Sequence, residues 1–130
     1  MSNKNRIIVF TRNPELGKVK TRLAKTLSDQ SALDIYKFLL IHTEKTIRNL
    51  GCDKVIYYSE NIQHNDLWDD TIYSKYLQKG TDLGQRMHNA FQDAFNNNFE
   101  KVIIIGSDLL DLKPVHIHQA FEHLDTNDFV

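Results

Sequence analysis

The chain has 130 residues, of which 41% are hydrophobic and 25% are charged, and its formal net charge is −1. This composition is that of an ordinary globular protein, and it excludes a disordered or fibrous chain. The length allows one domain at most, and the single cysteine, Cys52, excludes an internal disulfide and a cysteine-based zinc site. The sequence therefore predicts one domain over residues 1–130, with Cys52 as a packed thiol.

The first predicted element is a strand at residues 6–11, which form a continuous β-branched and aromatic run typical of a strand buried on both faces. The apolar part of this run, residues 7–10, is too short for a signal-peptide core or a membrane span. We therefore expect a cytoplasmic protein that does not cross a membrane. Pro14 and Gly17 predict that residues 12–20 form a loop.

The middle of the chain is predicted to form a long helix and two strands. Apolar residues spaced three and four apart predict a helix from Thr21, with a polar break at residues 28–29 and an end at Gly51. Residues 54–59 are predicted to form a second strand, and residues 72–77 a third, shorter one.

The last part of the chain adds a helix, a strand and a further helix. A helix is expected to begin at residues 80–82, residues 101–106 predict a fourth strand, and Pro114 begins another helix. Residues 129–130 resemble the start of one more strand, so we interpret the chain as truncated at its C-terminus. This order predicts an α/β fold with a mostly parallel sheet, flanking helices and right-handed crossovers. The expected apolar stripe of the helix after residue 82 consists of Leu83, Met87, Ala90, Phe91, Ala94 and Phe95.

Basic residues gather near the N-terminus, mostly in the loop after the first predicted strand. Residues 1–26 hold seven lysines and arginines against one acidic residue. Positive charge confined in this way suits an anion site better than a nucleic-acid surface, so we expect no nucleic-acid partner. A helix start at Thr21 and the backbone freedom of Gly17 both favour phosphate binding. The alternative is an ordinary solvated loop.

A carboxylate is expected opposite this loop. In doubly wound sheets the first strand commonly lies beside the fourth, and ligands bind beyond the carboxyl ends of the strands. That arrangement would bring Arg12 and the other basic loop residues, Lys18, Lys20 and Arg22, opposite Ser107 and Asp108. Cations that neutralise phosphate oxygens, together with a carboxylate that holds Mg²⁺, are what a bound diphosphate requires. For Asp108 the alternative is a loop cap.

A third candidate segment lies where the helix after the third strand begins. Gly80 and Gly84 stand on either side of Asp82, and Asp82 with Gln85 resembles a helix-capping box. Arg86, one turn into the helix, is expected to reach a phosphate or a base.

Three motifs carry a family resemblance: residues 10–23 (FTRNPELGKVKTRL), 80–87 (GTDLGQRM) and 106–112 (GSDLLDL). They resemble a bacterial family of uncharacterised GT-A-type, glycosyltransferase-like proteins in the nucleotide-diphospho-sugar transferase superfamily. The resemblance implies a Rossmann-like GT-A-type fold, of which residues 1–130 form the N-terminal part of a longer domain. Relatives have a cysteine-proline pair where this chain has Leu109 and Leu110.

The resemblance also implies which residues bind ligand. The element at residues 20–22 is similar to that of the phospholactate guanylyltransferases, which implies phosphate recognition there, and Asp108 stands where the superfamily has its metal-binding aspartate. The expected metal on Asp108 is Mg²⁺ or Mn²⁺, and no catalytic residue is assigned. The predicted nucleotide- and phosphate-binding residues are Thr11, Arg12, Gly17, Lys18, Lys20, Thr21, Arg22, Gly80, Asp82 and Arg86.

The predicted function is that of a transferase that binds a nucleotide or nucleotide-sugar donor and acts on an unidentified acceptor. Glycosyl transfer is the first hypothesis, and nucleotidyl transfer that makes a nucleoside-diphosphate-linked product is the second. A non-catalytic nucleotide- or anion-binding protein is the alternative from another class. The sequence does not specify an oligomeric state.

Overall fold

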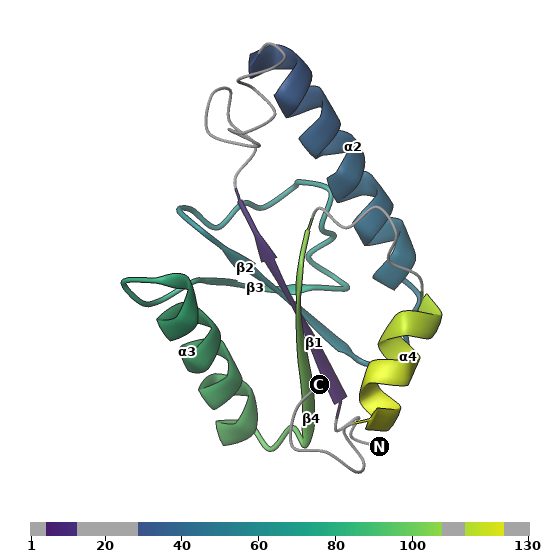
Figure 1. Ribbon diagram of the computed structural model, residues 1–130, viewed down its shortest axis with the longest axis vertical. Helices are drawn as coiled ribbons and strands as arrows, with labels where there is room; N and C mark the ends of the chain where they lie inside the picture. Colours follow the sequence, from purple (N-terminus) through teal and green to yellow (C-terminus); the bar gives the residue numbers. More distant parts are fainter. Residues whose placement is uncertain (1–4, 13–28, 108–113, 124–130) are drawn as a thin grey trace.

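The computed structural model describes residues 5–12, 29–107 and 114–123. Within these ranges strands and helices follow one another in the predicted order, and the strands form one parallel sheet in the order β3-β2-β1-β4 (Figure 1). The fold is therefore a Rossmann-like α/β fold. The elements are β1 (Asn5–Thr11), α2 (Asp29–Ile47), β2 (Asp53–Tyr58), β3 (Ser74–Leu77), α3 (Leu83–Asn96), β4 (Lys101–Gly106) and α4 (Pro114–His123).

Strand β1 lies between β2 and β4, as the doubly wound arrangement predicts. Ile8 is in register with Val55 on one side and with Ile104 on the other. Its neighbours Ile7 and Val9 are, like Ile8, fully buried, which explains the uninterrupted apolar run in the sequence. Burial of each such side chain contributes roughly 1.5–3 kcal/mol, so β1 is the centre of the fold.

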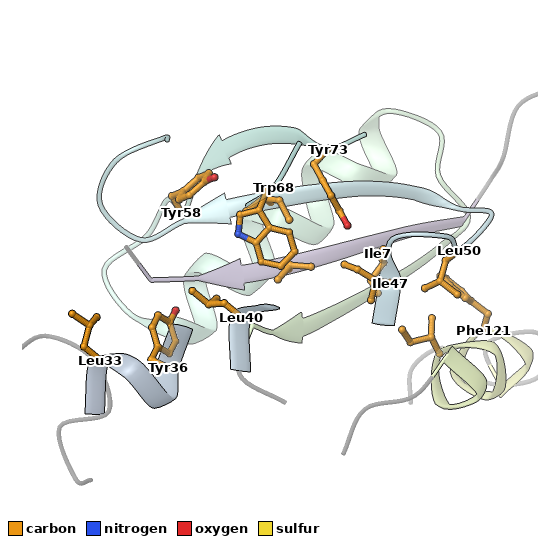
Figure 2. Packing of buried hydrophobic residues seen from close by; sticks show 13 residues of the cluster. Ile7, Leu33, Tyr36, Leu40, Ile47, Leu50, Tyr58, Trp68, Tyr73 and Phe121 are labelled. Carbon is orange, nitrogen blue, oxygen red and sulfur yellow. The ribbon is translucent and has the colours of Figure 1, made fainter. Parts of the chain in front are cut away.

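Helices cover both faces of this sheet. Successive strand residues point to opposite sides, so both faces present apolar side chains for helices to cover. Figure 1 shows α3 on one face and α2 with α4 on the other. On the α2 face, Ile7 belongs to one cluster with Leu40 of α2 and Phe121 of α4 (Figure 2). On the α3 face, Ile8 belongs to a second cluster with Ala90.

The segment between β2 and β3 also contributes to the core on the α2 face. Trp68 and Tyr73 are almost completely buried, and their rings meet edge to face with centroids 5.3 Å apart (Figure 2). Tyr73 donates a hydrogen bond from its hydroxyl to Glu44 Oε2 of α2 (2.9 Å), and this bond ties the segment to the helix. The segment is polar in sequence, yet its two aromatic side chains are core residues.

Several element boundaries differ from the prediction. Helix α2 ends at Ile47 rather than at Gly51. Strand β3 begins at Ser74, because the backbone N–H of Tyr73 closes the preceding turn by donating to Asp69 O (2.9 Å). The stripe of α3 is only partly buried: Ala94 is inside, whereas Phe95 is 49% exposed. The remaining predicted elements, the helix over residues 21–28 and the strand start at 129–130, lie outside the described residues. No described helix is long and apolar enough to cross a membrane.

Cys52 packs, partly buried, against the cluster on the α2 face, in agreement with the prediction of a packed thiol. Burial raises the pKa of this thiol, and the nearby Lys54 only partly opposes the shift. Because the thiolate is the reactive form, we expect native Cys52 to be alkylated by iodoacetamide at least ~3-fold more slowly than glutathione at about pH 8. Mass spectrometry of timed samples measures the rate, with protein unfolded in guanidinium as the control. Equal rates for native and unfolded protein would contradict the burial of the thiol.

Candidate functional site

The carboxyl ends of all the described strands meet at one edge of the sheet. Thr11 is in register with Tyr58, Tyr58 with Leu77, and Phe10 with Gly106. We call the edge formed by the ends of β1, β2, β3 and β4 the carboxyl edge. It is the edge at which parallel α/β sheets bind ligands, and the adjacency of the ends of β1 and β4 predicted from the sequence is confirmed there.

Tyr36 of α2 joins the ends of β1 and β4. Its hydroxyl accepts from the backbone N–H of Arg12 (2.9 Å), donates to Arg12 O (3.0 Å), and lies 3.3 Å from Thr11 Oγ1 and 3.1 Å from Ser107 Oγ. The Tyr36 side chain, with only 4% of the residue exposed, therefore connects the backbone at the start of the basic loop to the residue that precedes Asp108.

A second residue of α2 fixes Ser107 through its backbone. The Thr43 hydroxyl lies 2.9 Å from Ser107 O and 2.9 Å from Leu39 O, and these two carbonyl oxygens share its single hydrogen. Thr43 and Ser107 are both buried. The hydroxyl and the carbonyl of Ser107 are thus both held by α2, so the position from which the chain continues to Asp108 is fixed.

Gln78 organises the other half of the carboxyl edge, at the end of β3. Its side-chain Nε2 donates to Tyr57 O (3.0 Å) and, more weakly, to Thr11 O (3.4 Å). Its Oε1 accepts from an Arg86 guanidinium nitrogen (3.3 Å), and Arg86 Nε donates to Gly80 O (3.1 Å). The half-buried Arg86 side chain is therefore held at the carboxyl edge, on the side away from Ser107.

Local geometry explains the residues around the start of α3. Gly80 has φ +141°, and a Cβ atom there would lie 2.9 Å from Arg86 N, so this position requires glycine. Asp82 caps the helix by accepting from Gln85 N (2.7 Å), and Gln85 Oε1 accepts from Thr81 N (2.8 Å). The capping role predicted for Asp82 is confirmed, and a ligand-binding role for it stays a prediction.

The structure thus brings part of the predicted site to one edge. Thr11 ends β1 and Arg12 follows it, while Gly80, Asp82 and Arg86 come after β3. Among the ranges 5–12, 29–107 and 114–123, no three His, Cys, Asp or Glu side chains gather closely enough to hold a metal ion. The other predicted residues lie outside the described residues, and their roles stay predictions: Gly17, Lys18, Lys20, Thr21, Arg22 and Asp108.

Sequence reasoning missed three residues of the carboxyl edge: Tyr36, Thr43 and Gln78. Tyr36 and Thr43 lie at the helical spacing of three and four, which predicts only an inward-facing position, although a buried hydroxyl needs a hydrogen-bond partner and so signals a polar contact. Gln78 is a polar residue directly after a predicted strand, which is the position where ligand-binding side chains gather in parallel sheets. Both signals were present in the sequence.

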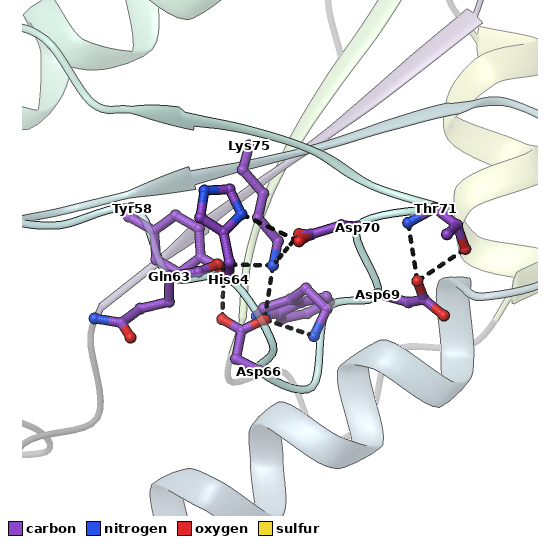
Figure 3. A network of polar contacts seen from close by, with 9 residues as sticks. Tyr58, Gln63, His64, Asp66, Asp69, Asp70, Thr71 and Lys75 are labelled. Carbon is purple, nitrogen blue, oxygen red and sulfur yellow. Dashed lines mark hydrogen bonds and ion pairs between the residues drawn. The ribbon is translucent and has the colours of Figure 1, made fainter.

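A second polar network lies beside α2 and connects the segment between β2 and β3 to both strands (Figure 3). Lys75 Nζ forms ion pairs with Asp66 (2.9 Å) and Asp70 (2.6 Å), and the Tyr58 hydroxyl donates to Asp66. The hydrogen bond from Lys75 lowers the pKa of Asp70, and burial raises the pKa of Tyr58. A hollow with a volume of about 670 Å³ lies next to this network, between α2 and residues 65–72. Because the carboxylates are paired within the protein, the network holds the segment in place.

Comparisons with known proteins find a similar solved structure and a matching family model. A search of curated proteins found no match. Among solved structures, the crystal structure of a "putative nucleotide-diphospho-sugar transferase" from Desulfovibrio desulfuricans G20 has a TM-score of 0.83 and 28% sequence identity. The match covers 95% of this chain and 55% of that one, so the chain spans about half the length of the neighbour. A family model described as "Uncharacterized protein conserved in bacteria (DUF2064)" matches residues 42–130.

The family match agrees with the resemblance that the three sequence motifs carry, and the neighbour agrees with both the resemblance and the fold. The match extends from the middle of α2 to the end of the sequence, and so includes Gln78, Arg86 and Ser107 at the carboxyl edge. Because the matched residues make up more than half of the sequence, the chain belongs to the DUF2064 family of bacterial proteins.

Proposed function

We propose that this chain is the donor-binding part of a nucleotide-sugar-dependent, glycosyltransferase-like protein. A nucleoside diphosphate, or its sugar conjugate, would bind with Mg²⁺ or Mn²⁺ at the carboxyl edge. The observation that carries the proposal is the Tyr36 hydroxyl, which bonds both Arg12 and Ser107. It places the start of the basic loop beside the residue that precedes Asp108, and the name of the structural neighbour supports the same class of donor.

The residues suit a metal-bound diphosphate. Magnesium usually takes one or two carboxylates and completes its shell with water and phosphate oxygens. Asp108 supplies one carboxylate, and it follows Ser107, whose side chain and carbonyl are both held by α2. When bound, the ion would neutralise charge on the phosphates.

The cationic side chains would stabilise charge that develops on the leaving diphosphate. Arg12 follows β1, and Arg86 is held near Gly80, at the β3 end of the sheet. Lys20 and Arg22, from the basic loop, complete the proposed set. A donor lying along the carboxyl edge would therefore meet cations from two separate segments.

The same metal ligand and cationic side chains suit two reactions. Glycosyl transfer breaks the bond between sugar and phosphate, whereas nucleotidyl transfer breaks a bond between phosphates. The similarity of residues 20–22 to the phospholactate guanylyltransferases favours nucleotidyl transfer as the second candidate. A protein that binds the nucleotide without chemistry is the third.

Thermal denaturation with a ligand panel tests the proposal. Nucleoside mono-, di- and triphosphates and nucleotide sugars would each be added with and without Mg²⁺. A ligand present at about 100 times its Kd stabilises the native state by about 2.7 kcal/mol, which raises the Tm by roughly 10 °C in a domain of this size. No Mg²⁺-dependent shift with any member of the panel would contradict the proposal. Turnover of the ligands that bind then separates an enzyme from a binding protein.

Removing two cations from the basic loop should weaken binding selectively. We expect Lys20→Ala combined with Arg22→Ala to raise the Kd for di- and triphosphates by ~30-fold or more, because two charge-assisted contacts to phosphate are lost. The Kd for the bare nucleoside should change little. Isothermal titration calorimetry measures both values.

The matched control is Lys45→Ala combined with Lys101→Ala. It removes the same charge from the last turn of α2 and from the first residue of β4, at the opposite end of the sheet. This control should bind di- and triphosphates like the wild type. Equal losses for nucleoside and triphosphate in the test variant would instead indicate a collapsed loop.

A further inference from the structure

The Tyr36 hydroxyl has more partners than one phenol can satisfy at once. It has one hydrogen and two lone pairs, but Arg12 N, Arg12 O, Thr11 Oγ1 and Ser107 Oγ all lie within 3.3 Å of it. At least one contact at a time is therefore left without a hydrogen bond. The hydrogen can turn from one acceptor to another while the heavy atoms stay in place, so this contact adapts to small shifts on either side.

The partners of Tyr36 belong to two parts of the chain that are far apart in sequence. Arg12 is 24 residues from Tyr36, and Ser107 is 71 residues from it. The backbone of β1 and β4 is already in register up to Phe10 and Gly106. Tyr36 extends this connection beyond the last paired positions, by two residues after Phe10, to Arg12, and by one residue after Gly106, to Ser107.

We propose that Tyr36 is a positioning residue that makes metal binding after β4 and phosphate binding after β1 cooperative. The inference rests on the proposed function, since it assigns how that site is regulated. Tyr36 would not contact the reacting atoms. It fixes the backbone of Arg12 relative to Ser107, so that a ligand bound on one side favours the backbone position that the ligand on the other side requires.

Thr43 provides an internal contrast. Its hydroxyl bonds Leu39 O and Ser107 O, and it therefore holds the end of β4 without linking it to β1 through these bonds. Tyr36 holds both ends. The predicted effect of removing the Tyr36 hydroxyl is therefore a loss of cooperation between two loops.

The test is Tyr36→Phe, which removes the hydroxyl and keeps the ring in the core. Tyr73→Phe is the matched control, because Tyr73 is a buried tyrosine on the same face of the sheet whose hydroxyl bonds Glu44 instead. The first readout is amide hydrogen exchange, measured by NMR without ligand. Exchange at both Arg12 and Ser107 should become about tenfold faster in Tyr36→Phe, and should not change in Tyr73→Phe.

The second readout is the ratio of the Kd without Mg²⁺ to the Kd with Mg²⁺, measured for UDP and GDP. This ratio should fall about fivefold in Tyr36→Phe, in the range of ordinary coupling between sites, and remain at the wild-type value in Tyr73→Phe. An unchanged ratio, or faster exchange at only one of the two amides, would overturn the inference. If nucleotide binding to the wild type did not depend on Mg²⁺, the proposed function would be wrong. The exchange measurement would still decide whether Tyr36 links the ends of β1 and β4.

Discussion

Asp108→Asn is expected to abolish the Mg²⁺ dependence of nucleotide binding. The asparagine keeps the shape of the side chain but removes the charge that holds the ion. We expect the Kd for a nucleoside diphosphate in the presence of Mg²⁺ to rise about 100-fold, the equivalent of about 2.7 kcal/mol, while the Kd without Mg²⁺ stays close to its wild-type value. Isothermal titration calorimetry with and without the metal measures both, and the Tm should change little.

The control for this variant is Glu122→Gln, which removes one carboxylate charge from an exposed position on α4. It should retain the full response to Mg²⁺. If Asp108→Asn bound the magnesium–nucleotide complex as tightly as the wild type, the assignment of the metal to Asp108 would be wrong.

The second large effect is expected at Gly80, where alanine should destabilise the fold and displace Arg86. An added Cβ would lie 2.9 Å from Arg86 N and 2.9 Å from Gln85 Cβ, at a φ of +141° that side chains disfavour. Strain and overpacking together cost about 2–4 kcal/mol, which corresponds to a fall in Tm of roughly 10 °C for a domain of this size. Thermal denaturation measures the loss.

Gly51→Ala is the matched control, because a Cβ at Gly51 meets nothing within 4 Å. It should melt at or slightly above the wild-type temperature, since alanine restricts the unfolded chain more than glycine does. A Gly80→Ala protein with an unchanged Tm would contradict the tight geometry at the start of α3.

Much of the fold follows from local sequence patterns. Uninterrupted β-branched and aromatic runs predict β1, β2 and β4. Most residues of β1 and β2 are buried, whereas β4 is mostly half-buried. The predicted start of β3 is two residues too early, because Ile72 and Tyr73 continue the apolar pattern. Tyr73 instead turns into the core and bonds Glu44, 29 residues away. A local pattern carries no information about such a distant partner.

Helix α3 shows a second limit of the pattern. Its apolar stripe predicts burial from Leu83 to Phe95, but these two residues are 63% and 49% exposed while Ala90 and Ala94 are buried. Periodicity identifies the face of a helix that is apolar. It does not show how much of that face the neighbouring sheet covers.

The candidate site was predictable where its geometry is local. The cap at Asp82 and the need for glycine at Gly80 depend on residues within six positions. The adjacency of β1 and β4 followed from the general rule for doubly wound sheets. The Tyr36 contacts were not predictable, because they span 24 and 71 residues and exist only in the folded chain.

The location of the bound nucleotide tests the central claim most directly. Isotope-labelled protein would be titrated with a nucleoside diphosphate and Mg²⁺ while the backbone amides are followed by NMR. We predict that the largest shifts occur at the carboxyl edge, at Arg12, Gly80 and Ser107, with little change at Asn5 and Lys101 at the opposite end of the sheet. Shifts concentrated at Asn5 and Lys101, with Arg12 and Ser107 unaffected, would contradict the account.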